Sequence, residues 1–273
     1  MRSVGFLIAL LVTGCTRAPP PTPLSDRLLQ LADAAAREAG ETAPTIKTTD
    51  AALAGITRSA QLYLERDTEP TEALRLAVFD ESKLVAETNA DDLRAMLLPT
   101  LLRDQRGTCL GLAQVYLSLA ERLDLDLRAV VVPGHLFLRA PGPAPNNIEL
   151  LRRGIRRSDP FYRSMFQVPE GVAAYMRPLT DDELVGVLHY NLGNAARMRG
   201  DLDTALAHST RAVRLFDDYP EAHATRGLIF QLRGELEAAA AAYARAQQLH
   251  PSLDGLGKNV AALEAARRSA GSR

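Results

Sequence analysis

The chain reads RGTCLGLAQVYLSLAERL from Arg106 to Leu123, and this stretch decides its fold. Between Cys109 and Leu123 no charged residue appears before Glu121, so the side chains around the expected helix are almost all apolar. A helix that is apolar on every side is a buried helix. We therefore predict a helix through the centre of the core, with Cys109 in its first turn.

Short strands are expected directly after this helix. Residues 127–132 form a run rich in β-branched side chains (LRAVVV), and residues 135–139 alternate in polarity (HLFLR). Pro133-Gly134 between them predicts a turn. A third short strand is expected at residues 147–150. Together these segments predict a small antiparallel sheet beside the buried helix.

Composition favours a mostly helical α+β protein and argues against a nucleic-acid partner. Of the 273 residues only 5% are aromatic and none is Trp, which favours helices over a sandwich or barrel. The formal net charge is -1, so the chain lacks the broad positive field that non-specific binding of nucleic acid requires. The length fits one large domain or two modest ones.

Four helices are expected before the buried one. Two lie within residues 24–65, the first with Ser25 and the second with residue 49 or 50 as its N-cap. A third covers residues 71–79. A fourth is capped at residues 89–92 and runs through Leu97 and Leu98, with Pro99 as an irregularity. All four are expected to serve as packing elements.

From residue 183 onward the sequence repeats itself with a period of 34. Five residue pairs show this period: Gly193 and Gly227, Gly200 and Gly234, Ala205 and Ala239, Ala212 and Ala246, and Leu215 and Leu249. The pattern resembles the tetratricopeptide repeat, whose small residues let two antiparallel helices cross closely. The resemblance implies repeats at residues 186–219 and 220–253 and a terminal capping helix at residues 258–268.

The boundary between two domains is expected at residue 181. The segment RPLTDDE at residues 177–183 supplies a Pro, then an N-cap residue, then acidic residues for a first helical turn. We therefore expect one domain over residues 24–180 and the repeats with their capping helix over residues 181–273. Because two repeats bury little surface alone, they are expected to pack on the preceding domain.

Cys109 and His135 are candidate catalytic residues. A thiol in the first turn of a helix lies beside free backbone N–H groups, and the helix dipole favours its thiolate. His135 begins the second expected strand and is a candidate base. Glu149 and Asn147 share one face of the next strand, because strand side chains alternate, and either could orient the imidazole.

Each of these residues also has a purely structural interpretation. A lone Cys on an apolar helix is usually a small buried hydrophobe, His135 could be a structural residue, and Glu149 could pair with Arg152 or Arg153 at the surface. The other histidines lack metal-ligand spacing, and no phosphate-binding loop, dinucleotide fingerprint or paired-cysteine motif is present. Neither a cofactor nor a metal is therefore expected.

Taken together, these segments resemble bacterial transglutaminase-like proteins that carry tetratricopeptide repeats. The resemblance rests on RGTCLGL at residues 106–112, PGHLFLR at residues 133–139 and NIE at residues 147–149. It spans about residues 74–259. For residues 24–180 it implies a fold similar to that of papain-type cysteine proteases.

The same resemblance implies roles for individual residues. Cys109 would be the nucleophile and His135 the base. The third position is Glu149, where the wider superfamily has Asp, and Asn147 is its rival. The backbone N–H of Cys109 and the side chain of Gln105 would form the oxyanion hole.

The first residues are expected to be a lipoprotein signal. Residues 4–12 form an apolar run that is too short to span a bilayer, and residues 12–15 (VTGC) resemble the lipobox of bacterial lipoproteins. The resemblance implies that residues 1–14 are removed and that Cys15 is acylated. Residues 15–23 contain four prolines and are expected to form an extended tether. An ordinary signal peptide followed by a stray Cys is the alternative.

Two functions from different classes fit these observations. The first is an enzyme whose Cys attacks an amide carbonyl, giving a thioester that water or an amine resolves. The second is a scaffold in which the Cys site is silent and the repeats hold a protein or peptide partner. In either case the lipid anchor would place the protein in the bacterial cell envelope, on the outer or inner membrane and facing the periplasm.

Overall fold

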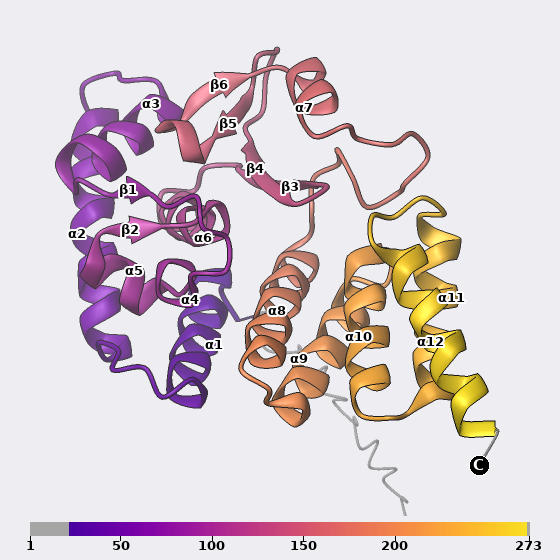
Figure 1. Cartoon of the computed structure of the whole chain (residues 1–273). Helices are drawn as coiled ribbons and strands as arrows, with labels where there is room; N and C mark the ends of the chain where they lie inside the picture. Colours follow the sequence, from indigo (N-terminus) through magenta and orange to yellow (C-terminus); the bar gives the residue numbers. More distant parts are fainter. Residues whose placement is uncertain (1–21, 272–273) are drawn as a thin grey trace, which may run out of the picture.

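The computed structural model describes residues 22–271, and most of them are helical (Figure 1). Cys15 and the expected signal peptide lie outside the described residues. We call residues 22–180 the first region and residues 181–271 the C-terminal helices. The helices of the first region are α1 (Leu24–Glu38), α2 (Ile46–Leu64), α3 (Pro70–Arg75), α4 (Leu93–Met96), α5 (Leu98–Asp104), α6 (Cys109–Arg122) and α7 (Asp159–Met165), with a π-helical segment η1 (Leu76–Glu81) after α3 and a 3-10 turn η2 (Leu150–Arg152).

The first region also contains two small sheets. The larger is antiparallel, with strands in the order β3 (Arg128–Val132), β4 (His135–Arg139), β5 (Asn147–Glu149) and β6 (Ile155–Arg157). In the smaller, β1 (Val85–Ala86) pairs in parallel with β2 (Arg106–Gly107). Strands β3, β4 and β5 lie where the sequence predicts them. The other three were not expected: β1 and β2 have only two residues each, and β6 (IRR) shows no alternation of apolar and polar side chains.

The turn between β3 and β4 has the geometry that its sequence predicts. Gly134 has a left-handed backbone with φ of 68°, a conformation that glycine adopts without steric cost. The register pairs Val132 with His135 directly across this turn. His135 therefore stands at the first position of β4, at one end of the sheet.

Helix α6 runs through the core, as its apolar sequence predicts. Every residue from Leu110 to Ala120 is buried, and α1, α2 and β4 pack around the helix. The buried Gln114 donates a hydrogen bond from Nε2 to the carbonyl oxygen of Met96 at 2.8 Å. This contact satisfies the amide nitrogen, while the buried Oε1 of Gln114 has no partner among the described residues.

The fourth expected helix is broken, because the extended backbone of Leu97 separates α4 from α5. Two other helices begin at residues other than those expected. Helix α1 starts at Leu24, because the carboxylate of Glu121 on α6 accepts hydrogen bonds from the N–H groups of Leu24 (2.6 Å) and Ser25 (2.9 Å). Helix α2 starts at Ile46, because the side chain of Thr45 caps its first turn. Ser25 is thus inside its helix. A cap supplied by a distant helix leaves no signal in the local sequence.

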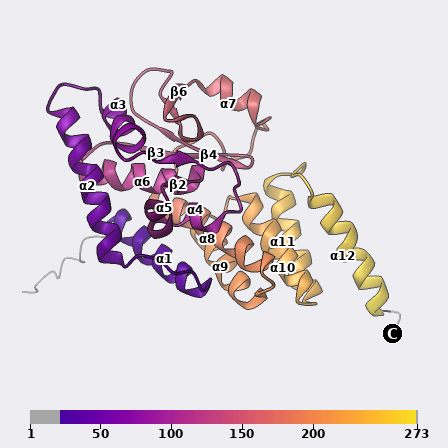
Figure 2. The same cartoon turned by 60° about the vertical axis from the view of Figure 1, so that its left-hand side comes forward.

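The C-terminal helices form two antiparallel pairs and one final helix (Figures 1 and 2). The first pair is α8 (Asp181–Met198) with α9 (Leu202–Leu215), and the second is α10 (Pro220–Leu232) with α11 (Leu236–Leu249); α12 (Leu256–Gly271) follows. Short loops connect the helices of each pair. The pairs lie side by side.

Positions 34 residues apart occupy equivalent places in the two pairs. Gly200 and Gly234 end the first helix of each pair with φ of 81° and 80°. At Gly193 and Gly227 the two helices of a pair approach so closely that a Cβ atom would crowd the neighbouring helix. Four alanines at paired positions are fully buried: Ala205, Ala212, Ala239 and Ala246. The period of the sequence is therefore the period of the helix pairs.

The hydrophobic core continues from the first region into α8. Helix α8 begins at Asp181, after a capping box formed by Thr180 and Glu183. Its residues Leu184 and Val187 are buried in the same apolar cluster as the first region. The first helix pair is therefore packed onto the first region through one shared core.

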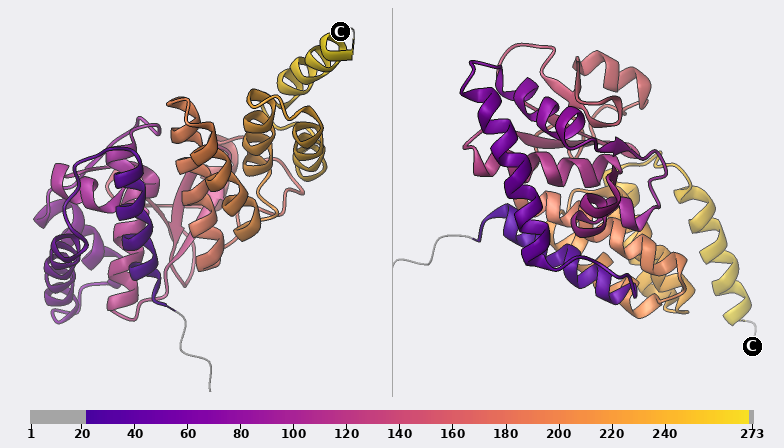
Figure 3. Two further views of the ribbon diagram at one scale, coloured as in Figure 1. Left: turned by 90° about the horizontal axis from the view of Figure 1, so that it is seen from below. Right: turned by 90° about the vertical axis from the view of Figure 1, so that its left-hand side faces the viewer.

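Helices α11 and α12 share a second, smaller core. Its buried members include Tyr243, Leu256 and Leu263. Helix α12 projects away from the body of the molecule (Figure 3). No helix among residues 22–271 combines the length and the apolar character that crossing a bilayer requires.

Candidate functional site

Cys109 is the first residue of α6, and backbone contacts hold this end of the helix in place. Thr108 is the N-cap, and its Oγ1 accepts a hydrogen bond from the N–H of Gly111 at 3.1 Å. The N–H of Thr108 donates to the carbonyl oxygen of Ala95 in α4 at 3.0 Å. A Cβ atom at position 111 would collide with that same carbonyl oxygen. The position of Cys109 is therefore set by close packing of α6 on α4.

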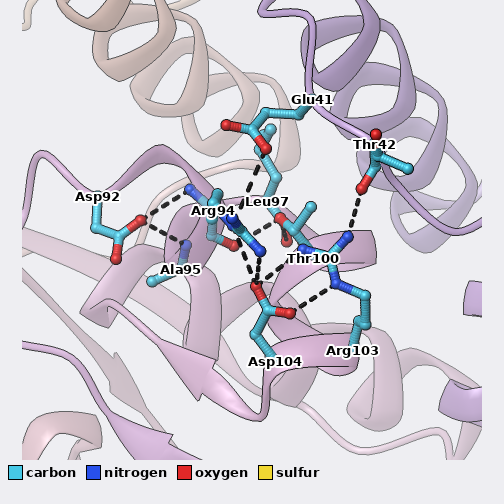
Figure 4. A network of polar contacts seen from close by, with 9 residues as sticks. All are labelled: Glu41, Thr42, Asp92, Arg94, Ala95, Leu97, Thr100, Arg103 and Asp104. Atoms are coloured by element: carbon cyan, nitrogen blue, oxygen red, sulfur yellow. Dashed lines mark hydrogen bonds and ion pairs between the residues drawn. The ribbon is translucent and has the colours of Figure 1, made fainter.

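A polar network at the surface holds α4 and α5 in turn (Figure 4). Asp92 caps α4 by accepting hydrogen bonds from N–H groups of its first turn. Arg94 pairs with Asp104 at the end of α5 at 2.9 Å, and Arg103 binds the same carboxylate and the carbonyl oxygen of Thr42. The two guanidinium groups lower the pKa of Asp104 to about 2. The network thereby fixes the backbone against which α6 begins.

His135 and Glu149 form a buried pair on adjacent strands. The Nε2 atom of His135 lies 2.9 Å from Oε2 of Glu149, and the residues are only 9% and 4% exposed. Glu149 Oε1 accepts a hydrogen bond from the N–H of Leu151 at 3.0 Å, so both carboxylate oxygens are held. Because a carboxylate accepts, Nε2 of His135 carries the hydrogen. Nδ1 is the ring nitrogen that Glu149 leaves available, and the side chain of His135 also interacts with that of Cys109.

Aromatic rings at the end of α7 fix the plane of the imidazole. The ring of Phe166 stacks on His135, with centroids 4.6 Å apart and planes inclined by 4°. Burial alone would lower the pKa of His135, but its interactions with Cys109 and Glu149 outweigh burial and raise the pKa to about 9. The imidazole is therefore cationic at neutral pH.

Asn147 makes contacts that keep it away from His135. Its Oδ1 accepts a hydrogen bond from Nε of Arg139, and its Nδ2 donates to Asp159, both at 2.8 Å. The register places Asn147 directly opposite Arg139, at the far end of β4 from His135. Of the two residues expected behind the imidazole, the structure brings Glu149 into contact with it.

Gln105, expected as an oxyanion donor, points elsewhere. Its backbone is left-handed with φ of 54°, and its Nε2 donates to the carbonyl oxygen of Ser82 at 3.1 Å. Its side chain does not line the cavity that contains Cys109. The structure therefore does not bring Gln105 to the candidate site.

Cys109 and His135 line one cavity of about 210 Å³ between the first region and the C-terminal helices. The first region contributes one wall, which includes Thr108, Leu110, Val131 and Leu136. Helices α8 and α10 and the residue before α10 contribute the opposite wall, which includes Val187, Tyr190, Asn194, Met198, Tyr219 and Glu221. A single water needs about 10–15 Å³ by this kind of measure, so the cavity has room for a substrate group of many atoms.

The opposite wall was not found from the sequence, where residues of this part were interpreted as scaffold only. One signal for Glu221 exists in the repeat itself. The positions 34 residues before and after it are Val187 and Gly255, so Glu221 is a charged residue where its repeat equivalents are not charged.

The arrangement is suited to thiol chemistry. A thiol, a cationic imidazole and an orienting carboxylate are the groups that nucleophilic catalysis by cysteine requires. Among residues 22–271, no group of three or more His, Cys, Asp or Glu side chains is placed to hold a metal ion.

Comparison with known proteins places the first region in a family. A family model described as the transglutaminase-like superfamily matches residues 27–167, just over half of the chain. The UPF0162 protein PA3419 of Pseudomonas aeruginosa is 31% identical to the chain over 127 residues, which cover 45% of this chain and 46% of that protein. The chain thus matches about half the length of this curated relative.

Proposed function

The chain belongs to the transglutaminase-like superfamily, and on that premise we propose that it is a cysteine-dependent enzyme acting on amide bonds. The observation that carries the proposal is the cavity in which Cys109 and His135 lie together, with Glu149 hydrogen-bonded to the outer nitrogen of the imidazole. Cys109 would be the nucleophile, His135 the general base and acid, and Glu149 the residue that positions His135.

The proposed reaction has two steps. The Cys109 thiolate attacks the amide carbonyl, and His135 gives its proton to the departing amine as the C–N bond breaks. This leaves a thioester on Cys109. In the second step His135 takes a proton from water or from an incoming amine, which attacks the thioester and releases an acid or a new amide. The outcome is hydrolysis in the first case and transamidation in the second.

The pair of His135 and Glu149 supports this role through charge and geometry. Glu149 fixes the tautomer and plane of the ring, as the acid does in other triads of this kind. It also stabilises the imidazolium that must form beside the thiolate. The backbone N–H of Cys109, at the start of α6, would donate to the oxyanion of the tetrahedral intermediate.

The test is the reactivity of Cys109 toward iodoacetamide across pH, with glutathione as a reference thiol. At about pH 6 an ordinary thiol is almost entirely protonated. The proposal predicts that Cys109 then reacts about a hundredfold faster than the reference and that His135→Ala removes most of this advantage. Equal reactivity of wild type and His135→Ala at low pH would refute the proposed pair. The modified peptide is identified by mass spectrometry, so that Cys15 does not contribute.

We further propose that α8 to α12 are tetratricopeptide repeats with a capping helix and that they bind a protein or peptide partner. The equivalence of positions 34 residues apart supports this interpretation. If Cys109 proves unreactive, this binding would be the main function, and the first region would be a silent scaffold. Affinity capture with the Cys109→Ala variant as bait tests the proposal. A partner retained by this variant and lost without α10 to α12 would support it.

The lipid anchor is also a proposal, because residues 1–21 lie outside the described structure. Acylation of Cys15 after removal of residues 1–14 would attach the protein to a membrane of the bacterial cell envelope, with residues 15–23 as a tether. Cys15→Ser should then remain an uncleaved precursor that takes up no labelled fatty acid. Normal processing of this variant would contradict the anchor.

A further inference from the structure

Glu221 is the one carboxylate that the C-terminal helices contribute to the cavity of Cys109 and His135. It lies in the first turn of α10. Its Oε1 accepts a hydrogen bond from the hydroxyl of Tyr175 at 2.5 Å. Its Oε2 is shielded from solvent and has no hydrogen-bond partner among the described residues. One oxygen of this carboxylate is therefore held, and the other has no partner beside the cavity that Glu221 lines.

Burial of this carboxylate lowers the stability of the folded protein. A shielded carboxylate oxygen without a partner loses its hydration and gains nothing in return. Within residues 22–271 no Lys, Arg or His forms an ion pair with Glu221. Burial raises the pKa of Glu221 to about 7 even though Tyr175 donates to it. A carboxylate that lowers the stability of the fold and lines a cavity is suited to bind a ligand that enters the cavity.

The surroundings of Glu221 favour a cation over a neutral or anionic group. Tyr190 and Tyr219 line the same wall, and the electron-rich faces of tyrosine rings attract cations. Burial raises the pKa of Tyr219 well above its ordinary value, and the nearby charges of Glu221 and Cys109 raise it further. A ligand group bound to Glu221 would therefore lie in the same cavity as Cys109 and His135.

We propose that Glu221 forms a cation subsite, in which Oε2 pairs with a primary ammonium group carried by the acyl part of the substrate. The inference rests on the proposed function, since Cys109 must attack a carbonyl in the same molecule. The substrates would be amides in which a short chain joins an ammonium group to the scissile carbonyl. The C-terminal helices thus form part of the substrate site as well as packing on the first region.

The test uses two electrophiles of the same size and different charge. Aminoethyl methanethiosulfonate carries an ammonium group, and propyl methanethiosulfonate has a methyl group in its place. Each forms a mixed disulfide with the Cys109 thiolate and releases methanesulfinate. The rates on the full-length protein are followed by mass spectrometry of the peptide that contains Cys109. The ratio of the two rates at about pH 8, above the pKa of Glu221 at about 7, measures the preference for a cation.

Glu221→Gln keeps the shape of the side chain and removes its charge. We expect the rate ratio to fall about tenfold in this variant, which is the size of one charge-assisted hydrogen bond. Asp91→Asn is the matched control, because Asp91 lines the same cavity but is exposed to solvent. The ratio should change little in the control. An unchanged ratio in Glu221→Gln, or an equal fall in Asp91→Asn, would overturn the subsite.

The same data separate this inference from the proposed function. The neutral propyl reagent reports only on the thiolate, so its rate at low pH should depend on His135 and not on Glu221. If that dependence on His135 is absent while the ratio still falls in Glu221→Gln, the cation subsite stands and the catalytic pair fails. If the dependence is present and the ratio does not fall, the pair stands and the subsite fails.

Discussion

The two walls of the cavity differ in how their polar atoms are satisfied. In the first region both oxygens of Glu149 have donors, and Thr108 is bonded through its side chain and its N–H. On the wall formed by the C-terminal helices, Glu221 has one bound oxygen and one without a partner. Reacting groups need a fixed geometry before substrate arrives, whereas a binding group must keep an open position for its ligand. The difference indicates that the first region holds the reacting groups and that the C-terminal helices bind the substrate.

The two regions also differ in how they are stabilised. The first region has an extended core around α6, which α8 joins. The outer C-terminal helices have two smaller clusters, one around Tyr243 and one formed by Ala196, Ala205 and Ile229. The binding wall therefore depends on the first region for its stability. The following predictions test this comparison.

The largest effect is expected when the C-terminal helices are separated from the first region. A fragment that begins at residue 181 would expose Leu184 and Val187, which are buried against the first region in the whole chain. We expect the fragment to be marginally folded and to melt without a sharp transition, as measured by circular dichroism against temperature. A sharp transition near that of the whole chain would show that the C-terminal helices are independent.

The next effect concerns the packing that places Cys109. Gly111→Ala puts a Cβ atom into the carbonyl oxygen of Ala95, and backbone cannot yield as a flexible side chain can. We expect a loss of about 2–4 kcal/mol in the free energy of unfolding, measured by urea denaturation. Gly55→Ala in α2 is the control, because nothing lies near its Cβ position. It should stabilise the protein by up to about 1 kcal/mol.

A smaller effect is expected from the acid behind the imidazole. Glu149→Gln keeps the side-chain shape but removes the charge that favours the imidazolium of His135. We expect labelling of Cys109 by iodoacetamide at about pH 6 to slow by about tenfold. Asn147→Ala should lower the stability, because Arg139 and Asp159 lose a partner, and should leave this rate unchanged. If Asn147→Ala slowed the labelling and Glu149→Gln did not, Asn147 would be the residue that orients His135.

The last effect is the loss of stability that Glu221 itself causes. Its pKa is about 7 in the folded protein against 4.5 as the ordinary value. The folded state therefore holds this proton to a higher pH than the unfolded state, and stability falls as pH rises from about 4.5 through 7. Glu221→Gln should remove that fall and be more stable than wild type by about 3 kcal/mol at pH 8, because each pKa unit of the shift corresponds to about 1.4 kcal/mol. Thermal melts at pH 8 and at pH 4.5, where the difference should vanish, check the prediction.

Local patterns in the sequence predicted the parts of the fold that local physics determines. An almost wholly apolar helix must be buried, and a run of β-branched residues followed by Pro-Gly predicts a hairpin, so α6 and the β3–β4 pair were expected. The period of 34 predicted the paired helices. Cys109 was placed at a helix start and His135 at a strand start, where the structure has them.

The choice between Glu149 and Asn147 was decided by tertiary structure alone. Both residues lie on one face of β5, and alternation along a strand treats them alike. The register between β4 and β5 places Asn147 opposite Arg139 and leaves Glu149 within reach of His135. Strand register depends on how the sheet packs, so no local pattern could reveal it.

The binding wall likewise came only from the packing of distant segments. Glu221 is 86 residues beyond His135 and lies in a helix whose sequence indicates only a repeat. It enters the cavity because α8 shares its core with the first region and α10 packs on the helices of the first pair. Helical and strand patterns report which face of an element is buried. They carry no information on which distant element will cover that face, because this is decided by the packing of the whole chain.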